Sequence, residues 1–110
     1  MVSYILIREL SKLEKLILEY FVRHISVGEI IAVIDLREEV KRLRDPDLVS
    51  EFDDPVIEME INKAIARLVE KGYLERATGC YNLSENLRRK IIEKYGSLRP
   101  GEPKSLNDIL

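Results

Sequence analysis

The spacing of apolar residues changes at Gly72, and this change constrains the fold more than any other feature of the sequence. Before this glycine, apolar residues recur at intervals of three and four, which is typical of one buried face of an α-helix. The residues of this expected face are Ile57, Ile61, Ala64, Ile65, Leu68 and Val69. The pair Asp54-Pro55 predicts an N-cap followed by the first helical position, and Gly72 predicts the end of the helix.

After Gly72 the sequence indicates a β-hairpin and a last helix. Residues 73–77 and 80–83 predict two short strands, and Thr78-Gly79 between them is typical of a tight turn. Ser84 predicts the N-cap of the last helix. We expect the inner face of that helix to consist of Leu87, Ile91, Ile92 and Tyr95.

An earlier helix is predicted to begin at Ser11, because Ser11 and Glu14 have the spacing of a capping box. Its expected core face consists of Leu10, Leu13, Ile17, Tyr20, Phe21 and His24. Leu18 and Val22 lie on a second apolar face of the same helix, which favours a dimer or a docking surface. Residues 4–7, ahead of this helix, are compatible with either a helical turn or a short strand.

Residues 30–34 form a β-rich run after Gly28, and this run predicts a short strand. Asp35 and Glu38 form a cap-like pair that predicts a short second helix. The apolar residues expected along this helix are Leu36, Val40 and Leu43. Residues 44–54 predict an acidic connection in which Leu48, Val49 and Phe52 form one helical turn against the domain.

The composition favours one small domain of a soluble, cytoplasmic protein. Of the 110 residues, 45% are apolar, and we expect residues 1–95 to fold and 96–110 to form a flexible tail. No apolar run approaches the ~20 residues that span a bilayer, and no secretory leader is visible. High charge without Gln or Trp is typical of proteins from hot environments.

Few residues are available for catalysis or metal binding. Cys80 and His24 are the only residues of their types in the sequence, which excludes an internal disulfide framework, a multi-cysteine metal site and a histidine-rich metal site, and weakens most histidine-dependent catalytic schemes. Cys80 is expected to be a packed strand residue, with redox sensing or an intersubunit bridge as the alternatives. We expect His24 to stabilise the end of its helix. The sequence therefore predicts no enzyme, no cofactor and no metal site.

Charge is distributed unevenly along the chain. Seven acidic residues and no Lys or Arg occur between Asp45 and Glu60, whereas residues 61–99 contain nine cations and four anions. The acidic run superficially suggests a calcium loop, but it lacks the glycine and terminal glutamate of an EF-hand. We therefore expect a solvated acidic linker.

The predicted order is helix, short strand, helix, helix, strand, turn, strand, helix. Residues 65–76, Ile-Ala-Arg-Leu-Val-Glu-Lys-Gly-Tyr-Leu-Glu-Arg, resemble the end of the recognition helix and the first wing strand of MarR-like and ArsR-like regulators. This resemblance extends over residues 11–95. It implies a mainly α-helical winged helix-turn-helix with a small hairpin, in a small DNA-associated protein of archaeal type.

The resemblance also implies a non-enzymatic regulatory or accessory factor that binds duplex DNA. The first two turns of the recognition helix, which enter the major groove in such proteins, correspond here to residues 58–63. The candidate DNA-binding residues are Lys41, Arg42, Arg44, Asn62, Lys63, Arg67 and Arg76.

An alternative hypothesis is a protein–protein interaction module, because Glu58 and Glu60 would repel DNA phosphates. In this interpretation the acidic third helix docks on a basic partner, such as a polymerase or another replication or transcription subunit. The candidate docking residues are Asp53, Asp54, Glu58, Glu60, Leu18, Val22, Leu106, Ile109 and Leu110. The chain would be a homodimer or a subunit of a complex.

Leu106, Ile109 and Leu110 have the spacing of a short docking helix at the C-terminus. This spacing is similar to that of sliding-clamp-binding peptides, although their leading glutamine and paired aromatic residues are missing. A different docked partner and a simple frayed tail are the other interpretations.

Overall fold

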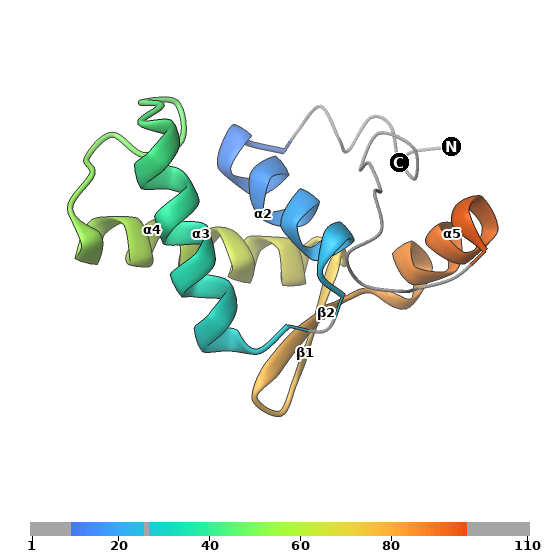
Figure 1. Ribbon diagram of the computed structural model, residues 1–110. Helices are drawn as coiled ribbons and strands as arrows, with labels where there is room; N and C mark the ends of the chain where they lie inside the picture. The colour runs from blue at the N-terminus through green and yellow to red at the C-terminus, as the bar shows by residue number, and fades with distance from the viewer. Residues whose placement is uncertain (1–9, 26, 97–110) are drawn as a thin grey trace.

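The computed structural model describes residues 10–25 and 27–96 of the chain. The helices are α2 (Lys12–Arg23), α3 (Glu29–Leu43), α4 (Asp54–Glu70) and α5 (Glu85–Tyr95), and β1 (Leu74–Ala77) and β2 (Cys80–Leu83) form an antiparallel hairpin. Helices α2 and α3 both pack against α4, and the hairpin follows the C-terminal end of α4 (Figure 1). The N-terminal half of α4 and helix α5 lie at opposite ends of the molecule. The mainly helical class with a small hairpin is thus confirmed, and the arrangement is compatible with a winged-helix layout.

Helix α2 begins as predicted. The Ser11 hydroxyl accepts a hydrogen bond from the Glu14 backbone N–H at 3.0 Å, and the Glu14 carboxylate accepts one from the Ser11 N–H at 2.8 Å. Leu18 and Val22 are completely buried, so the predicted exposed second face is wrong. The reason is that α2 packs against both α4 and β2, and both of its apolar faces therefore belong to one core.

The predicted strand at residues 30–34 is wrong, because this segment forms the first turns of α3. Gly28 is the N-cap, so Asp35 and Glu38 lie inside the helix rather than at its start. The helix buries Ala32, Leu36 and Val40, which are spaced four residues apart on one face. Strand pairing before α3 is reduced to a single bridge between Gly28 and Cys80.

The connection between α3 and α4 packs as expected but forms a turn. Leu48 and Val49 are buried and Phe52 packs against the core, whereas Leu43 is largely exposed, contrary to its predicted core position. The Leu48 N–H donates to the Asp45 carbonyl at 2.9 Å, which closes a turn rather than the predicted helical turn.

Helix α4 and the hairpin follow the sequence pattern closely. The N-cap is Asp53, one residue before the predicted position, and Pro55 lies in the first turn. The expected core face of α4 is buried, although Val69 is only half-buried. Gly72 has a φ of 83°, a left-handed conformation that favours glycine and reverses the chain into β1. Gly79 has a φ of 69° in the hairpin turn.

Helix α5 starts at the predicted cap, where the Ser84 hydroxyl accepts from the Leu87 N–H at 3.5 Å. Leu87 and Ile91 are buried and Tyr95 packs against the core. Ile92 is largely exposed, so its predicted place on the inner face is wrong. The expected element at residues 4–7 and the expected tail from 97 onward lie outside the described residues.

A buried ion cluster joins the start of α2 to the end of α4. The Glu14 side chain is only 2% exposed and accepts hydrogen bonds from Arg67 Nε at 2.6 Å and Lys71 Nζ at 3.1 Å. Burial by itself raises the pKa of the Glu14 carboxyl, but the hydrogen bonds from the Ser11 N–H, Arg67 and Lys71 outweigh this effect and lower the pKa below its usual 4.5. Glu14 therefore serves as a helix cap and an interhelical ion-pair partner together.

We predict that Glu14→Gln lowers the free energy of unfolding by about 2 kcal/mol at pH 7, since charge-assisted hydrogen bonds are each worth ~1.5–3 kcal/mol. The stabilisation from the lowered pKa is present above the ordinary value of 4.5 and is lost as the pH falls through the folded-state pKa. The difference between wild type and variant should therefore shrink in acid. Urea unfolding at pH 7 and pH 3 measures it, with Glu70→Gln, an exposed substitution at the end of α4, as the matched control. An equal difference at both pH values would contradict this account.

Candidate protein-docking surface

A groove of about 410 Å³ runs between the first turns of α3 and the N-terminal half of α4. We define the α3–α4 surface as this groove and the exposed side chains beside it. The lining residues of the groove are Glu29, Ile30, Val33, Ile34, Arg37, Glu58 and Asn62. Three of these residues are aliphatic and four are polar or charged.

Three isoleucines of α3 are exposed at this surface. Ile30, Ile31 and Ile34 are 76%, 58% and 42% exposed. They are exposed because Ala32 and Leu36 turn the opposite face of α3 to the core. Exposed aliphatic area is unfavourable by ~25 cal/mol per Å² relative to its burial, so a contiguous aliphatic surface of this kind is typical of an interaction site.

Ion pairs fix α3 against the start of α4. Arg37 of α3 pairs with Glu58 of α4 beside the groove. One turn further along α3, Lys41 Nζ lies 3.1 Å from an Asp54 carboxylate oxygen. The side chains of Arg37 and Glu58 are both partly shielded from water, and their pair joins the two helices beside the groove.

Acidic residues dominate the segment that contains this surface. Residues 27–60 contain eleven Asp and Glu and four Lys and Arg. Three of the four cations pair with carboxylates of the same segment: Arg37 with Glu58, Lys41 with Asp54 and Arg42 with Glu39. This segment therefore has a negative net charge, and the charged residues that line the groove are Glu29, Arg37 and Glu58.

The candidate DNA-binding residues are spread over α3, α4 and β1. Arg67 binds buried Glu14, and Arg76 donates to the Tyr81 hydroxyl at 2.8 Å. Arg44 is the C-cap of α3 and has a left-handed backbone conformation. Exposed Lys63 and groove-lining Asn62 lie along α4. The structure does not gather these candidates, together with Lys41 and Arg42, into one cationic groove.

The candidate docking residues fall into four groups. Glu58 lines the groove, Asp53 caps α4 and Asp54 pairs with Lys41, so these three lie at or near the α3–α4 surface. Glu60, half-buried, is on α4 but does not line the groove. Leu18 and Val22 are core residues and cannot contact a partner, which corrects their assignment. Leu106, Ile109 and Leu110 lie outside the described residues.

The sequence pattern does not indicate an exposed isoleucine surface on a helix, because β-branched side chains favour strands. A signal for the helix was nevertheless present. Ala32, Leu36 and Val40 follow one another at intervals of four, which is a helical spacing that places Ile30, Ile31 and Ile34 on other faces.

The remaining candidate residues from the sequence are His24 and Cys80. Within residues 10–25 and 27–96, no group of three His, Cys, Asp or Glu side chains is arranged to hold a metal ion. His24 is the C-cap of α2, and its ring lies 4.7 Å from that of Tyr20. Burial and a hydrogen bond to Asp35 raise the pKa of Tyr20 to about 12, so this hydroxyl remains a donor at neutral pH. Cys80 is a half-buried free thiol in β2.

No helix in the part of the chain that the structure describes is long and apolar enough to cross a membrane.

Comparison with known protein families identifies one relationship. The family model described as PolB1 Binding Protein 2 matches residues 11–89, which is more than half of the chain, so the chain belongs to this family. The match fits the archaeal type inferred from the sequence, and it favours the protein–protein interaction hypothesis over DNA-binding regulation. No curated protein and no solved structure matches the chain.

We predict that Ile30→Ser changes the free energy of unfolding by less than ~0.5 kcal/mol, because the side chain is mostly in water already. Leu36→Ala, two turns along the same helix but in the core, should lower it by ~2–4 kcal/mol through the cavity that it leaves. Thermal or urea unfolding of the two variants measures the contrast. A large destabilisation by Ile30→Ser would show that Ile30 supports the fold and would argue against a surface kept for binding.

Proposed function

We propose that this chain, as a member of the PolB1 Binding Protein 2 family, is a non-enzymatic accessory subunit that binds polymerase B1 through the α3–α4 surface. The observation that carries the proposal is the exposure of Ile30 and Ile34 in the lining of the groove, with exposed Ile31 adjacent in the sequence of α3. A domain of this size gains no stability from three aliphatic side chains in water. A partner that covers them removes that area from solvent.

The form of the groove suits partner side chains that are partly apolar. The aliphatic lining residues can bury apolar side chains of a partner. The Asn62 amide and the Arg37–Glu58 pair, which also line the groove, offer hydrogen-bonding groups. Interfaces commonly combine a central apolar cluster with a polar rim. The α3–α4 surface has both parts on two elements that are fixed to each other.

The negative charge around this surface specifies the partner further. Proteins that act on nucleic acids carry basic surfaces, and an acidic domain is attracted to such surfaces over distances of about a Debye length. The complementary partner surface therefore consists of apolar side chains surrounded by Lys and Arg. A polymerase can present such a surface outside its DNA channel.

The same features weigh against direct DNA reading by the first turns of α4. Affinity for DNA comes largely from cations that neutralise phosphates, whereas this region presents isoleucines, Met59 and carboxylates. The scaffold that resembles a DNA-binding regulator thus serves protein binding here, in keeping with the rule that function lies in sites rather than in folds.

We predict that the double variant Ile30→Asp/Ile34→Asp weakens binding to purified polymerase B1 by at least ~100-fold, because it places charge where an apolar cluster is buried. Calorimetry or surface plasmon resonance measures the affinity, and circular dichroism checks that the variant is folded. Ile92→Asp, which changes an exposed isoleucine on α5, is the matched control and should bind like wild type. Equal binding by the double variant and wild type would exclude the α3–α4 surface.

We also predict that the association rate falls as salt is raised, and that Glu29→Lys at the edge of the groove lowers it by several fold at low salt. The reason is that long-range attraction acts mainly on encounter rather than on the lifetime of the complex. Stopped-flow measurements at several salt concentrations test this, with Glu70→Lys as the control. A rate that is independent of salt would contradict an acidic docking surface.

A further inference from the structure

We propose that the exposed face of α5 is a second docking surface, which contacts the phosphate backbone of duplex DNA held by the bound polymerase. This inference rests on the proposed function, because it concerns DNA that the polymerase positions. We call this face the α5 face and define it by Arg88, Arg89 and Lys94.

The two halves of the described chain carry opposite charge. Residues 61–96 contain eight Lys and Arg and four Asp and Glu, whereas residues 27–60 contain four and eleven. The α3–α4 surface therefore belongs to a strongly negative region and the α5 face to a positive one. A chain with this separation can bind a basic surface at one end and a polyanion at the other.

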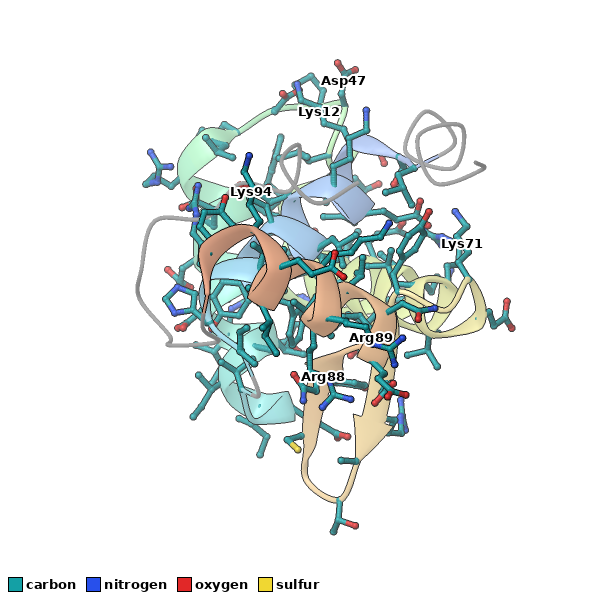
Figure 2. The ribbon with its side chains drawn as sticks, turned by 90° about the vertical axis from the view of Figure 1, so that its right-hand side faces the viewer. Lys12, Asp47, Lys71, Arg88, Arg89 and Lys94 are labelled. Atoms are coloured by element: carbon teal, nitrogen blue, oxygen red, sulfur yellow. The ribbon has the colours of Figure 1, made fainter. Side chains whose placement is uncertain are left out.

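The three defining cations lie on one element. Figure 2 shows Arg88, Arg89 and Lys94 on α5 in the foreground. The N-terminal half of α4, which lines the groove, lies at the other end of the molecule (Figure 1). Docking through the α3–α4 surface thus leaves the α5 face uncovered.

Internal ion pairs leave this face positive. Glu14 holds Arg67 and Lys71 within the fold, so neither is counted in the α5 face. Arg88 pairs with Glu75 at 3.2 Å and Arg89 with Glu85 at 2.9 Å, and these four side chains are 31% to 71% exposed. Exposed pairs of this kind contribute little energy, and a phosphate can replace the carboxylate as the acceptor of the guanidinium.

The composition of the α5 face favours DNA phosphates over an acidic protein. A stable protein interface needs a central cluster of apolar anchors, and among the described residues of α5 the one large exposed aliphatic side chain is Ile92. Phosphate contacts need only cations and hydrogen-bond donors, and they carry no sequence information. The α5 face has three cations on one helix and lacks an apolar centre.

Because the α5 face contacts only a few phosphates, we expect the chain alone to bind duplex DNA weakly, with a Kd of ~10⁻⁴ M at physiological salt. Once the chain is docked on the polymerase, the same contacts become intramolecular and act at an effective concentration in the ~mM range. The expected result is that the chain raises the affinity of the polymerase for duplex DNA by about tenfold. Each phosphate contact also adds ~0.9 to the steepness of the salt dependence.

The test measures fluorescence anisotropy of a labelled primer–template duplex with polymerase B1 and saturating full-length chain over a salt series. We expect Arg88→Gln/Arg89→Gln/Lys94→Gln to abolish the tenfold gain and to reduce the salt slope by two to three, while polymerase binding, measured by plasmon resonance, stays unchanged. Arg42→Gln, which removes an exposed cation of α3, is the control and should keep the gain. Glu93→Lys, on exposed α5, should increase it.

The outcomes separate this inference from the proposed function. A triple variant that binds polymerase and still gives the full gain overturns the α5 face as a DNA contact and leaves the proposed function standing. A triple variant that loses polymerase binding shows that α5 contacts protein and also overturns the inference. Failure of the wild-type chain to bind polymerase would instead overturn the proposed function, whatever happens with DNA.

Discussion

The arrangement of this domain depends on one buried carboxylate. Glu14 caps α2 through the Ser11 N–H and accepts hydrogen bonds from Arg67 and Lys71 of α4. A carboxylate that is 2% exposed is stable as a charge only when its oxygens are fully paired, so this cluster fixes the register of α2 along α4. Lys71 of this cluster directly precedes Gly72, where the chain reverses into the hairpin.

The same cluster explains how a scaffold like that of a DNA-binding regulator can serve protein binding. Arg67, a side chain that could reach phosphates, is engaged internally. At the other end of α4, the pairs Arg37–Glu58 and Lys41–Asp54 neutralise the cations of α3 and fix its isoleucines outward. These pairs lie beside an apolar core that holds the helices together, and the surface that remains is aliphatic and acidic.

Local signals predicted much of the fold. The Ser11–Glu14 box, the Ser84 cap, Gly72 and the Thr78-Gly79 turn act over a few residues, and each has the predicted role. Residues 30–34 were mistaken for a strand because β-branched side chains favour strands locally, whereas burial of Ala32, Leu36 and Val40 on α4 determines the helix. The docking surface could not be predicted, since exposure of isoleucines depends on which face of α3 meets the core. Burial of Leu18 and Val22 likewise depends on two neighbours that are distant in sequence.

Hydrogen–deuterium exchange of the full chain, free and bound to polymerase B1, tests the central claim most directly, because amide protection locates the contacted elements without any substitution. We predict that protection on binding is concentrated in the first turns of α3 and the N-terminal half of α4, around Ile30, Ile34 and Asn62. Protection confined to the hairpin and α5, with the first turns of α3 unchanged, would contradict the assignment of the α3–α4 surface to the polymerase.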